Sequence, residues 1–328
     1  MKPRRRAERI VAVAAVTSIL WAVTATTVVP WCSITVSTDE GLRDAVETMP
    51  PGSTICLQPG AYEAGFTVRQ SVTIRGVGAA GEVVLRAGGE PDTPVIDLQP
   101  LYRETMLVRL ENLTVTGASG GEGYGEQRGD HGLFVDRDVH LLLRNVICSG
   151  NGGAGVYLEE EATLNAYECT FSDAMYGVLL AGRCAARLVE CTVSETVMGV
   201  GVPEGGQLYL ADCTISGNTE YGALLVGGQA MIDRCEFADN AWGLVIGAPY
   251  GLPASLEMID STVAGSEHVG VALLSSSCLD SGPPEGAAAL VSGEWNSIPG
   301  PEVEGGNAGG ALCPAWPDPL WPEEFLRD

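Results

Sequence analysis

The sequence has almost no lysine and a large excess of acidic residues. Lys2 is the only lysine in 328 residues, and Lys and Arg together number 18 against 42 Asp and Glu. Five of the bases lie within the first nine residues, so the rest of the chain is more acidic still. Such a surface repels phosphate backbones and anionic lipid head groups, which argues against nucleic acid as a partner and against adsorption to membranes. Polysaccharides and cell-surface proteins remain open as partners.

Aromatic residues are also scarce, at 6 %, whereas hydrophobic residues make up 45 % of the chain. The chain can therefore bury a large core, and intrinsic disorder is excluded for most of its length. Because aromatic side chains are so few, we expect this core to consist mostly of aliphatic residues and cysteine.

Residues 1–25 are typical of an export segment. A basic head is followed by an apolar run that starts at Ile10, and no charge appears between Arg9 and Asp39. The run predicts a signal peptide cleaved after Ala25, although its extension through Val29 is also long enough for an uncleaved membrane anchor. In both cases we expect an extracytoplasmic protein that is secreted, periplasmic or anchored at the cell surface.

Internal repetition dominates the middle of the sequence. Segments such as Glu168-Cys-Thr-Phe-Ser and Asp212-Cys-Thr-Ile-Ser recur with a period of 22 residues. Each is followed by a glycine and alternating apolar residues, as in Gly177-Val-Leu-Leu, and the same frame extends to segments near Asn112 and Asp260. This period, with short β-type runs and no helical periodicity, predicts an all-β parallel solenoid whose turns stack about 4.8 Å apart.

We expect the solenoid over residues 33–274, and a degenerate last turn with an irregular C-terminal cap over residues 275–328. One amphipathic helix is predicted before the repeats, since Ser37-Thr-Asp-Glu40 resembles a capping box and Pro50-Pro51-Gly52 ends the pattern. Its apolar face consists of Leu42, Ala45, Val46 and Met49. A helix at this place is expected to cap the open end of the solenoid.

The opening of the chain resembles that of secreted right-handed parallel β-helix proteins, the pectin-lyase-like superfamily. The similarity lies in Gly41-Leu-Arg-Asp-Ala-Val, in the run from Gly52 to Tyr62 and in Ser71-Val-Thr-Ile-Arg-Gly76, and the later repeats resemble the generic coil motif of these proteins. It implies a right-handed parallel β-helix, a single-stranded solenoid, over roughly residues 34–274. It implies little about activity, because the superfamily includes lyases, hydrolases, epimerases, tailspikes and non-catalytic members.

The repeated cysteines are expected to form a buried ladder of free thiols. Parallel neighbours in register stand too far apart for a relaxed disulfide, and cysteine then serves as a small hydrophobic residue. The ladder comprises Cys169, Cys191, Cys213 and Cys235. We expect disulfides instead in the irregular ends, between Cys278 and Cys313 and between Cys32 and Cys56.

Acidic residues gather at one corner of the predicted solenoid. Asp136 and Asp138 in one turn are expected above Glu159 and Glu161 in the next. Clustered oxygen ligands suit calcium, as in a calcium-assisted lyase, and no other cofactor is expected. The alternative is a solvated turn in which Arg137 pairs with Glu160.

A stripe of flat side chains precedes the repeat glycines. Tyr176, Tyr221 and Trp242 take this position in three of the turns, in a chain that is poor in aromatics. Aligned rings along a rod are able to stack on sugar rings, so the stripe is a candidate carbohydrate-binding surface. The alternative is that these rings pack at a turn.

The longest insertion, residues 117–131, is a further candidate site. It contains Glu126, Arg128, Asp130 and His131, which together supply acids, a base and a cation. The separated Asp pairs, Gly-His-Gly and Arg-x-Lys of polygalacturonases are absent, and we expect no arginine-rich groove like that of pectate lyases.

The favoured function is therefore an exported, non-catalytic scaffold or binding protein for a glycan. The alternative is a polysaccharide lyase or glycoside hydrolase acting on an acidic or neutral polysaccharide.

Overall fold

The computed structural model describes residues 31–88, 93–101, 104–119, 128–203, 205–247, 254–274, 289–297 and 303–304. The predicted export segment, Glu126 and the cysteine pair Cys278 and Cys313 lie outside these ranges. Within them, no helix is long and apolar enough to cross a membrane.

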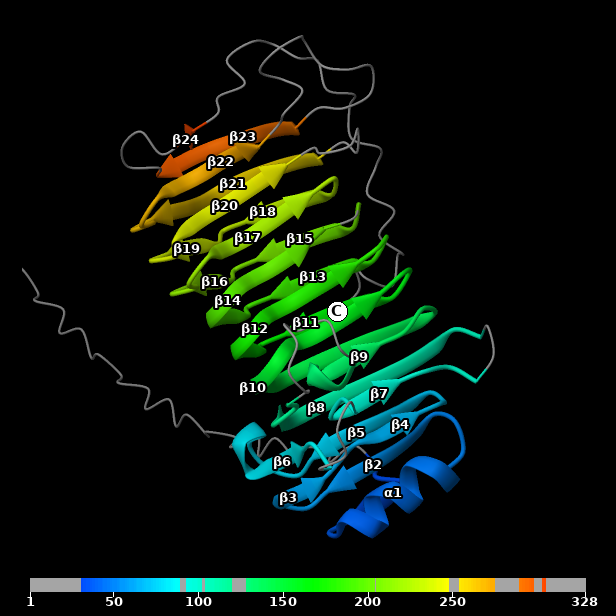
Figure 1. Ribbon diagram of the computed structural model, residues 1–328. Helices are drawn as coiled ribbons and strands as arrows, with labels where there is room; N and C mark the ends of the chain where they lie inside the picture. The colour runs from blue at the N-terminus through cyan, green and yellow to red at the C-terminus, as the bar shows by residue number, and fades with distance from the viewer. Residues whose placement is uncertain are drawn as a thin grey trace, which may run out of the picture. The chain divides into compact units, whose positions relative to one another are not determined.

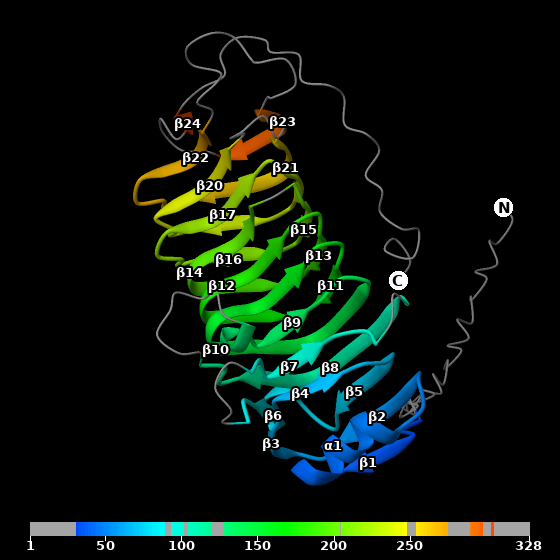
Figure 2. The ribbon, with the colours of Figure 1, turned by 45° about the vertical axis from the view of Figure 1, so that its right-hand side comes forward.

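The strands stack in parallel into a solenoid of about nine turns (Figures 1 and 2). Each turn visits three faces, which we name the first, second and third sheets in chain order. The first sheet contains β1 (Ile34–Val36), β2 (Ser53–Leu57), β5 (Val72–Gly76), the starts of β8 (Met106–Thr116) and β10 (Val139–Glu159), β11 (Thr163–Tyr167), β13 (Ala185–Val189), β15 (Gln207–Ala211), β18 (Gln229–Asp233), the start of β21 (Ala254–Ala264) and β23 (Ala289–Ser297).

Two further sheets complete each turn. The second contains β3 (Gly60–Glu63), β6 (Val83–Arg86), the end of β8, the middle of β10, the starts of β12 (Thr170–Ala181) and β14 (Thr192–Val202), β16 (Thr214–Ser216), β19 (Glu236–Ala238) and the end of β21. The third contains β4 (Phe66–Val68), β7 (Ile96–Leu98), β9 (Leu133–Val135), the ends of β10, β12 and β14, β17 (Tyr221–Val226), β20 (Trp242–Gly247), β22 (Val269–Leu274) and β24 (Val303–Glu304). Two 3-10 helices, η1 (Ala80–Glu82) and η2 (Arg128–Asp130), lie between strands.

A single left-handed residue turns the chain from the first to the second sheet. Its φ lies between 46° and 54° in every repeat, a conformation that costs most side chains energy but that Asn and Asp tolerate well. The sequence places polar residues there, and Asn145 Nδ2 donates a hydrogen bond of 2.9 Å to Asn112 Oδ1 of the preceding turn. The residues are Asn112, Asn145, Glu168, Glu190, Asp212, Arg234 and Asp260.

The repeat glycine is required where the chain enters the third sheet. A Cβ added to Gly177 would lie 2.6 Å from the carbonyl oxygen of Gly199, and one added to Gly199 would lie 2.4 Å from that of Gly222. Real Cβ atoms do not approach a backbone oxygen so closely. Glycine recurs here because adjacent turns pack backbone against backbone, and not because its φ is left-handed.

Buried ladders of side chains run along the axis. The four repeated cysteines are free and at most 3 % exposed, as the spacing predicted. At the next corner, Asn218 Nδ2 donates to Asn240 Oδ1 over 2.7 Å, and Asn218 Oδ1 accepts from Thr196 Oγ1 over 2.6 Å. This polar ladder satisfies backbone groups inside an otherwise apolar core, since Asn240 Nδ2 also donates to the Ile215 carbonyl.

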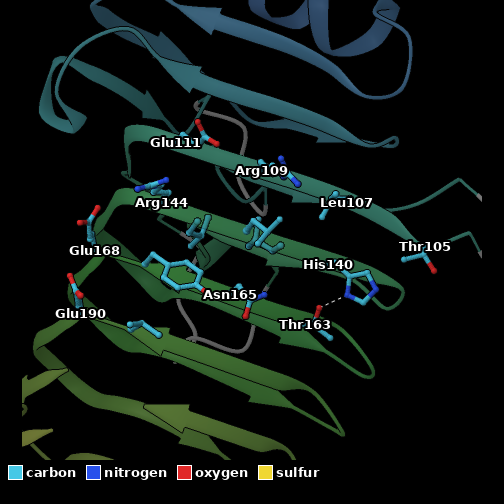
Figure 3. A pocket seen from close by; sticks show the side chains of 15 residues that line it. Thr105, Leu107, Arg109, Glu111, His140, Arg144, Thr163, Asn165, Glu168 and Glu190 are labelled. Carbon is cyan, nitrogen blue, oxygen red and sulfur yellow. Dashed lines mark hydrogen bonds between the residues drawn. The ribbon is translucent and has the colours of Figure 1, made fainter. Parts of the chain in front are cut away.

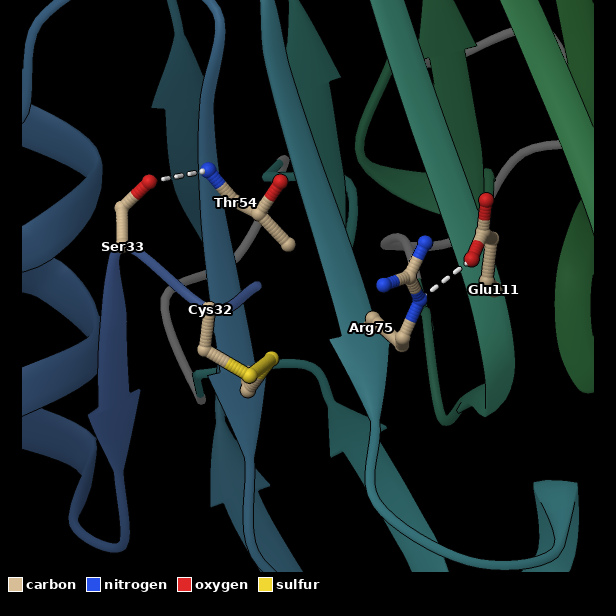
Figure 4. The surroundings of a disulfide bond; sticks show 6 residues. Cys32, Ser33, Thr54, Arg75 and Glu111 are labelled. Atoms are coloured by element: carbon tan, nitrogen blue, oxygen red, sulfur yellow. Dashed lines mark hydrogen bonds and ion pairs between the residues drawn. A yellow bond between two sulfur atoms is a disulfide. The ribbon is translucent and has the colours of Figure 1, made fainter. Parts of the chain in front are cut away.

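The first turn is covered by α1 (Asp39–Thr48), whose Leu42, Ala45 and Val46 are buried against it. The cap helix is thus confirmed, but its N-cap is Thr38, whose hydroxyl accepts from the Gly41 amide over 3.1 Å. A disulfide joins Cys32 to Cys56, as expected, with a Cα–Cα distance of 5.7 Å (Figure 4).

Candidate functional site on the third sheet

The candidate site lies on the outer face of the third sheet, over β7, β9 and the end of β10. Strand alternation buries Leu98, Val135 and Leu158 in the core and turns their neighbours outward. Asp97, Phe134 and Tyr157 are in register on successive strands and form one outward row. The next outward row holds Asp136 and Glu159, one residue past Val135 and Leu158. Two carboxylates therefore face the same side on adjacent turns.

Arg128 covers this face from η2. Its Nη2 donates to Asp97 Oδ1 over 2.7 Å, and its guanidinium carbon stands 3.9 Å from the centre of the Phe134 ring. The cation is thus held by a carboxylate and an aromatic face together. Since the Arg128 side chain keeps about a third of its exposure (36 %), it is also accessible to a ligand.

His131 is buried below the site. It is 1 % exposed, its Nδ1 accepts a hydrogen bond of 2.9 Å from the Ala154 amide, and its ring stacks on Tyr157 at 4.5 Å. Burial and the nearby Arg128 lower the pKa of His131 to about 4. It is therefore neutral in most conditions and acts as a support for Tyr157.

Two carboxyl groups of the site, those of Asp97 and Glu159, have raised pKa values. Burial, followed by the charge of Asp136, raises the pKa of Glu159, and Arg128 counteracts this only partly. Burial likewise raises the pKa of Asp97 despite its bond to Arg128. A carboxyl group with a raised pKa, Glu159, beside a second carboxyl group, Asp136, is an arrangement suited to acid–base chemistry.

The structure brings together some of the predicted residues and separates others. Arg128, His131, Asp136 and Glu159 converge, whereas Asp130 is buried at 3 % exposure. The predicted metal set of Asp136, Asp138, Glu159 and Glu161 is not formed, since the described residues contain no group of three or more metal-ligating side chains placed to hold an ion. The expected turn pair is present instead, with Arg137 Nη2 at 2.6 Å from Glu160 Oε1.

Sequence reasoning missed Asp97, Phe134 and Tyr157. Phe134 and Tyr157 stand two residues after the repeat glycines Gly132 and Gly155, so the repeat frame itself could have marked them as outward neighbours. Asp97 lies in an irregular early turn where that frame is weak. Its contact with Arg128 joins residues 31 positions apart and carries no local signal.

The aromatic stripe continues the same face along later turns. Tyr221 is in register with Trp242, and Tyr176 is linked to them through Met198. All three rings are half-buried, and Tyr221 and Trp242 pack with Leu224 around Val245. The stripe is therefore a packed apolar surface that is still partly exposed.

Comparisons with known proteins agree with this architecture. The family described as "Right handed beta helix region" matches residues 131–281. No curated protein sequence matches the chain. The solved structure of an alginate lyase from Paenibacillus sp. str. FPU-7 is similar with a TM-score of 0.51 at 14 % identity, over 82 % of this chain and 98 % of the lyase. The enzymatically active domain of tailspike protein 2 from bacteriophage CBA120 is similar with a TM-score of 0.50 at 13 % identity, over 73 % of this chain but only 38 % of the tailspike.

The protein is a right-handed parallel β-helix with the pectin-lyase-like fold. The expectation of a non-catalytic scaffold is contradicted, because the two similar solved structures named above are an alginate lyase and an enzymatically active tailspike domain. The enzymatic alternative is the better supported of the two.

Proposed function

We propose that the protein is an enzyme that cleaves a polysaccharide on the outer face of the third sheet. The observation that carries this proposal is the pair Asp136 and Glu159, which face outward on adjacent turns with the pKa of Glu159 raised. The enzymes that share the fold support it, although their low identity bears on the fold alone. The proposal includes the extracytoplasmic location expected from the N-terminal segment, where such polymers occur.

The pair suits hydrolysis of a glycosidic bond. Glu159, whose pKa is raised by burial, acts in its protonated form and donates its proton to the leaving oxygen as the bond to the anomeric carbon breaks. Asp136, as the carboxylate, either removes a proton from the attacking water or attacks the anomeric carbon itself and is then released by water. In the first route Glu159 ends as the carboxylate and Asp136 as the acid, and one proton exchanged through solvent restores both. In the second route Glu159 takes its proton back from the water that releases Asp136, so both routes add one water across the bond.

The neighbouring residues are suited to hold the sugar chain. Asp97 and the amide oxygen of Gln99 fix Arg128 over Phe134, which leaves only part of its guanidinium N–H groups to donate to sugar oxygens. Tyr157, held by His131, offers an aromatic face beside the carboxylates. Farther along the same face, Tyr176, Tyr221 and Trp242 extend the surface on which further sugars would stack.

The test is product release from a panel of neutral and uronate polysaccharides. Glu159→Gln and Asp136→Asn should each lower the rate of reducing-end formation by about 10²-fold or more, because each removes a proton-transfer or nucleophilic group. Glu161→Gln is the matched control: it neutralises an exposed carboxylate two residues from Glu159 and should leave the rate unchanged.

Two results would contradict the proposal. Products that carry the ultraviolet absorbance of a new double bond would show elimination by a lyase and would remove the hydrolytic assignment. Equal rates for Glu159→Gln and Glu161→Gln, or no product from any polymer, would remove the site.

A further inference from the structure

A second hollow lies on a different face of the molecule. A groove with a volume of about 810 Å³ runs over the outer face of the first sheet, across β8, β10, β11 and β13 (Figure 3). The candidate catalytic residues belong to the third sheet, so the groove is a separate feature. Its lining combines arginine, an amide, a tyrosine and a histidine, a set of side chains that the proposed catalytic step does not use.

Arginine is concentrated on this sheet although the chain has a net charge of −24. Arg75 is neutralised by Glu111, but Arg109 and Arg144, exposed on the adjacent strands β8 and β10, have no ion-pair partner within the described part of the chain. Two guanidinium groups thus point into the groove and are free to meet an anion.

Asn165 supplies an unsatisfied acceptor in the same groove. Its side chain is only 8 % exposed, and its Oδ1 has no hydrogen-bond partner among the described atoms. Figure 3 shows it between His140 and the strand edge that carries Glu168. A buried carbonyl oxygen without a donor is unfavourable, so a ligand hydroxyl that moves the covering side chains aside and donates to it would be stabilised.

Tyr167 adds a flat surface that is held in place. Arg187 on the next strand donates a hydrogen bond to its hydroxyl, and the guanidinium carbon of Arg187 stands 5.2 Å from the ring centre. At the other end of the groove, His140 Nδ1 and Thr163 Oγ1 are 2.5 Å apart. Glu168 and Glu190 border the groove beyond Tyr167 and would repel an anionic group from that edge.

We propose that this groove binds an acidic sugar unit of a glycan, such as a uronate. The sugar carboxylate pairs with Arg109 and Arg144, a hydroxyl donates to Asn165 Oδ1, and the ring lies against Tyr167. The combination selects a ligand that carries both an anion and hydroxyl donors, which neither an inorganic anion nor a neutral sugar provides. This inference does not rest on the proposed catalysis, because the two sites share no residue.

The experiment measures calorimetric binding of a homogeneous oligogalacturonate to the full chain with the Glu159→Gln substitution, so that turnover does not interfere. Arg109→Ala and Arg144→Ala should each weaken binding about tenfold or more, since each removes a charge-assisted bond. Asn165→Asp should weaken it as well, because a carboxylate there repels the ligand. Arg86→Ala is the matched control: it removes an exposed arginine on the second sheet and should leave the affinity unchanged.

Ligand controls complete the test. The same oligomer with its carboxyl groups reduced to alcohols should bind far more weakly, and sulfate should not compete at similar concentrations. Equal affinity for the reduced oligomer, equal effects of Arg86→Ala and Arg109→Ala, efficient competition by sulfate, or absence of binding would each overturn the inference. If Asn165→Asp fails to fold, as thermal unfolding would show, the two arginine variants decide the outcome. Loss of catalysis in Glu159→Gln with binding retained would separate this site from the proposed active site.

Discussion

His131 is a titratable residue that the fold keeps neutral. It is enclosed by the third sheet, accepts a hydrogen bond from the backbone and stacks on Tyr157, so protonation would require a charge to be placed in a nearly dry site next to Arg128. The pH of the medium therefore affects, through His131, how firmly the side chains of the candidate site are held. Acid that protonates His131 weakens the support of Tyr157.

This coupling gives a prediction for stability. The ordinary pKa of His131 is 6.5 and its folded value is about 4, so the stability that it contributes is complete above pH 6.5 and is lost as the pH falls towards 4. The size of this loss is about 3 kcal/mol by linkage. His131→Asn keeps an acceptor for the Ala154 amide but does not titrate. Urea unfolding at pH 6.5 and at pH 4 should show a smaller acid-induced loss in the free energy of unfolding for the variant than for the unmodified protein. The same loss in both proteins would contradict the prediction.

The residues of the two sites differ in how far the sequence could reveal them. Arg128, Asp136 and Glu159 lie in or near an insertion and an acidic corner, which are local signals. Arg109 and Arg144 are ordinary single arginines in separate repeats, and only the stacking of β8 on β10 places them together. Nothing in the local sequence marks Asn165 either, because its oxygen is buried by outward side chains that come from three different strands.

The stacked strands depend on close contact between backbones at the repeat glycine. Gly199→Ala would place a Cβ 2.4 Å from the Gly222 carbonyl oxygen, so the two turns must move apart. We expect a loss of about 2–4 kcal/mol in the free energy of unfolding, typical of a backbone clash in a packed core. Chemical unfolding measures this change.

Gly152→Ala is the control for this substitution. Gly152 is exposed, and a Cβ there would meet its nearest atom, the Ala118 carbonyl oxygen, at an ordinary 3.5 Å. Its unfolding free energy should change by about 1 kcal/mol or less. A similar loss in both variants would show that glycine matters for its flexibility rather than for close packing.

The elements were predictable where the repeat is regular. The helix, the parallel strands and the thiol ladder all follow from spacing, because stacked turns convert a sequence period directly into a spatial row. The long strands were not foreseen as continuous: β10 runs from Val139 to Glu159 through the corners of all three sheets. In the sequence a polar residue such as Asn145 indicates the end of a strand. In the structure Asn145 alone takes the left-handed conformation at this corner and bends β10, and the pairing of β10 with β8 continues on both sides of it.

The whole molecule presents different chemistry on different faces. The third sheet carries carboxylates and aromatic rings, whereas the first sheet carries the arginine groove, and both are built from the same turns. Because β10 contributes to both, a polymer bound at one face is kept close to the other. An enzyme built in this way would hold an acidic polysaccharide while it cuts it.

The constant register of the third sheet fixes the length of sugar chain that its outer face is able to contact. From Tyr157 on β10 to Val245 on β20 one register position passes through β12, β14 and β17, a span of roughly 19 Å at one strand spacing per turn, and Trp242 packs over the buried Val245 at its far end. A sugar chain lying along the axis must cover this whole span to contact both Tyr157 and Trp242. Oligosaccharides shorter than this span should be cleaved more slowly than longer ones, as product chromatography over a length series would show. Trp242→Ala should remove the advantage of the longer chains, and a rate independent of length in the unmodified protein would mean that the far end of the row does not contact the substrate.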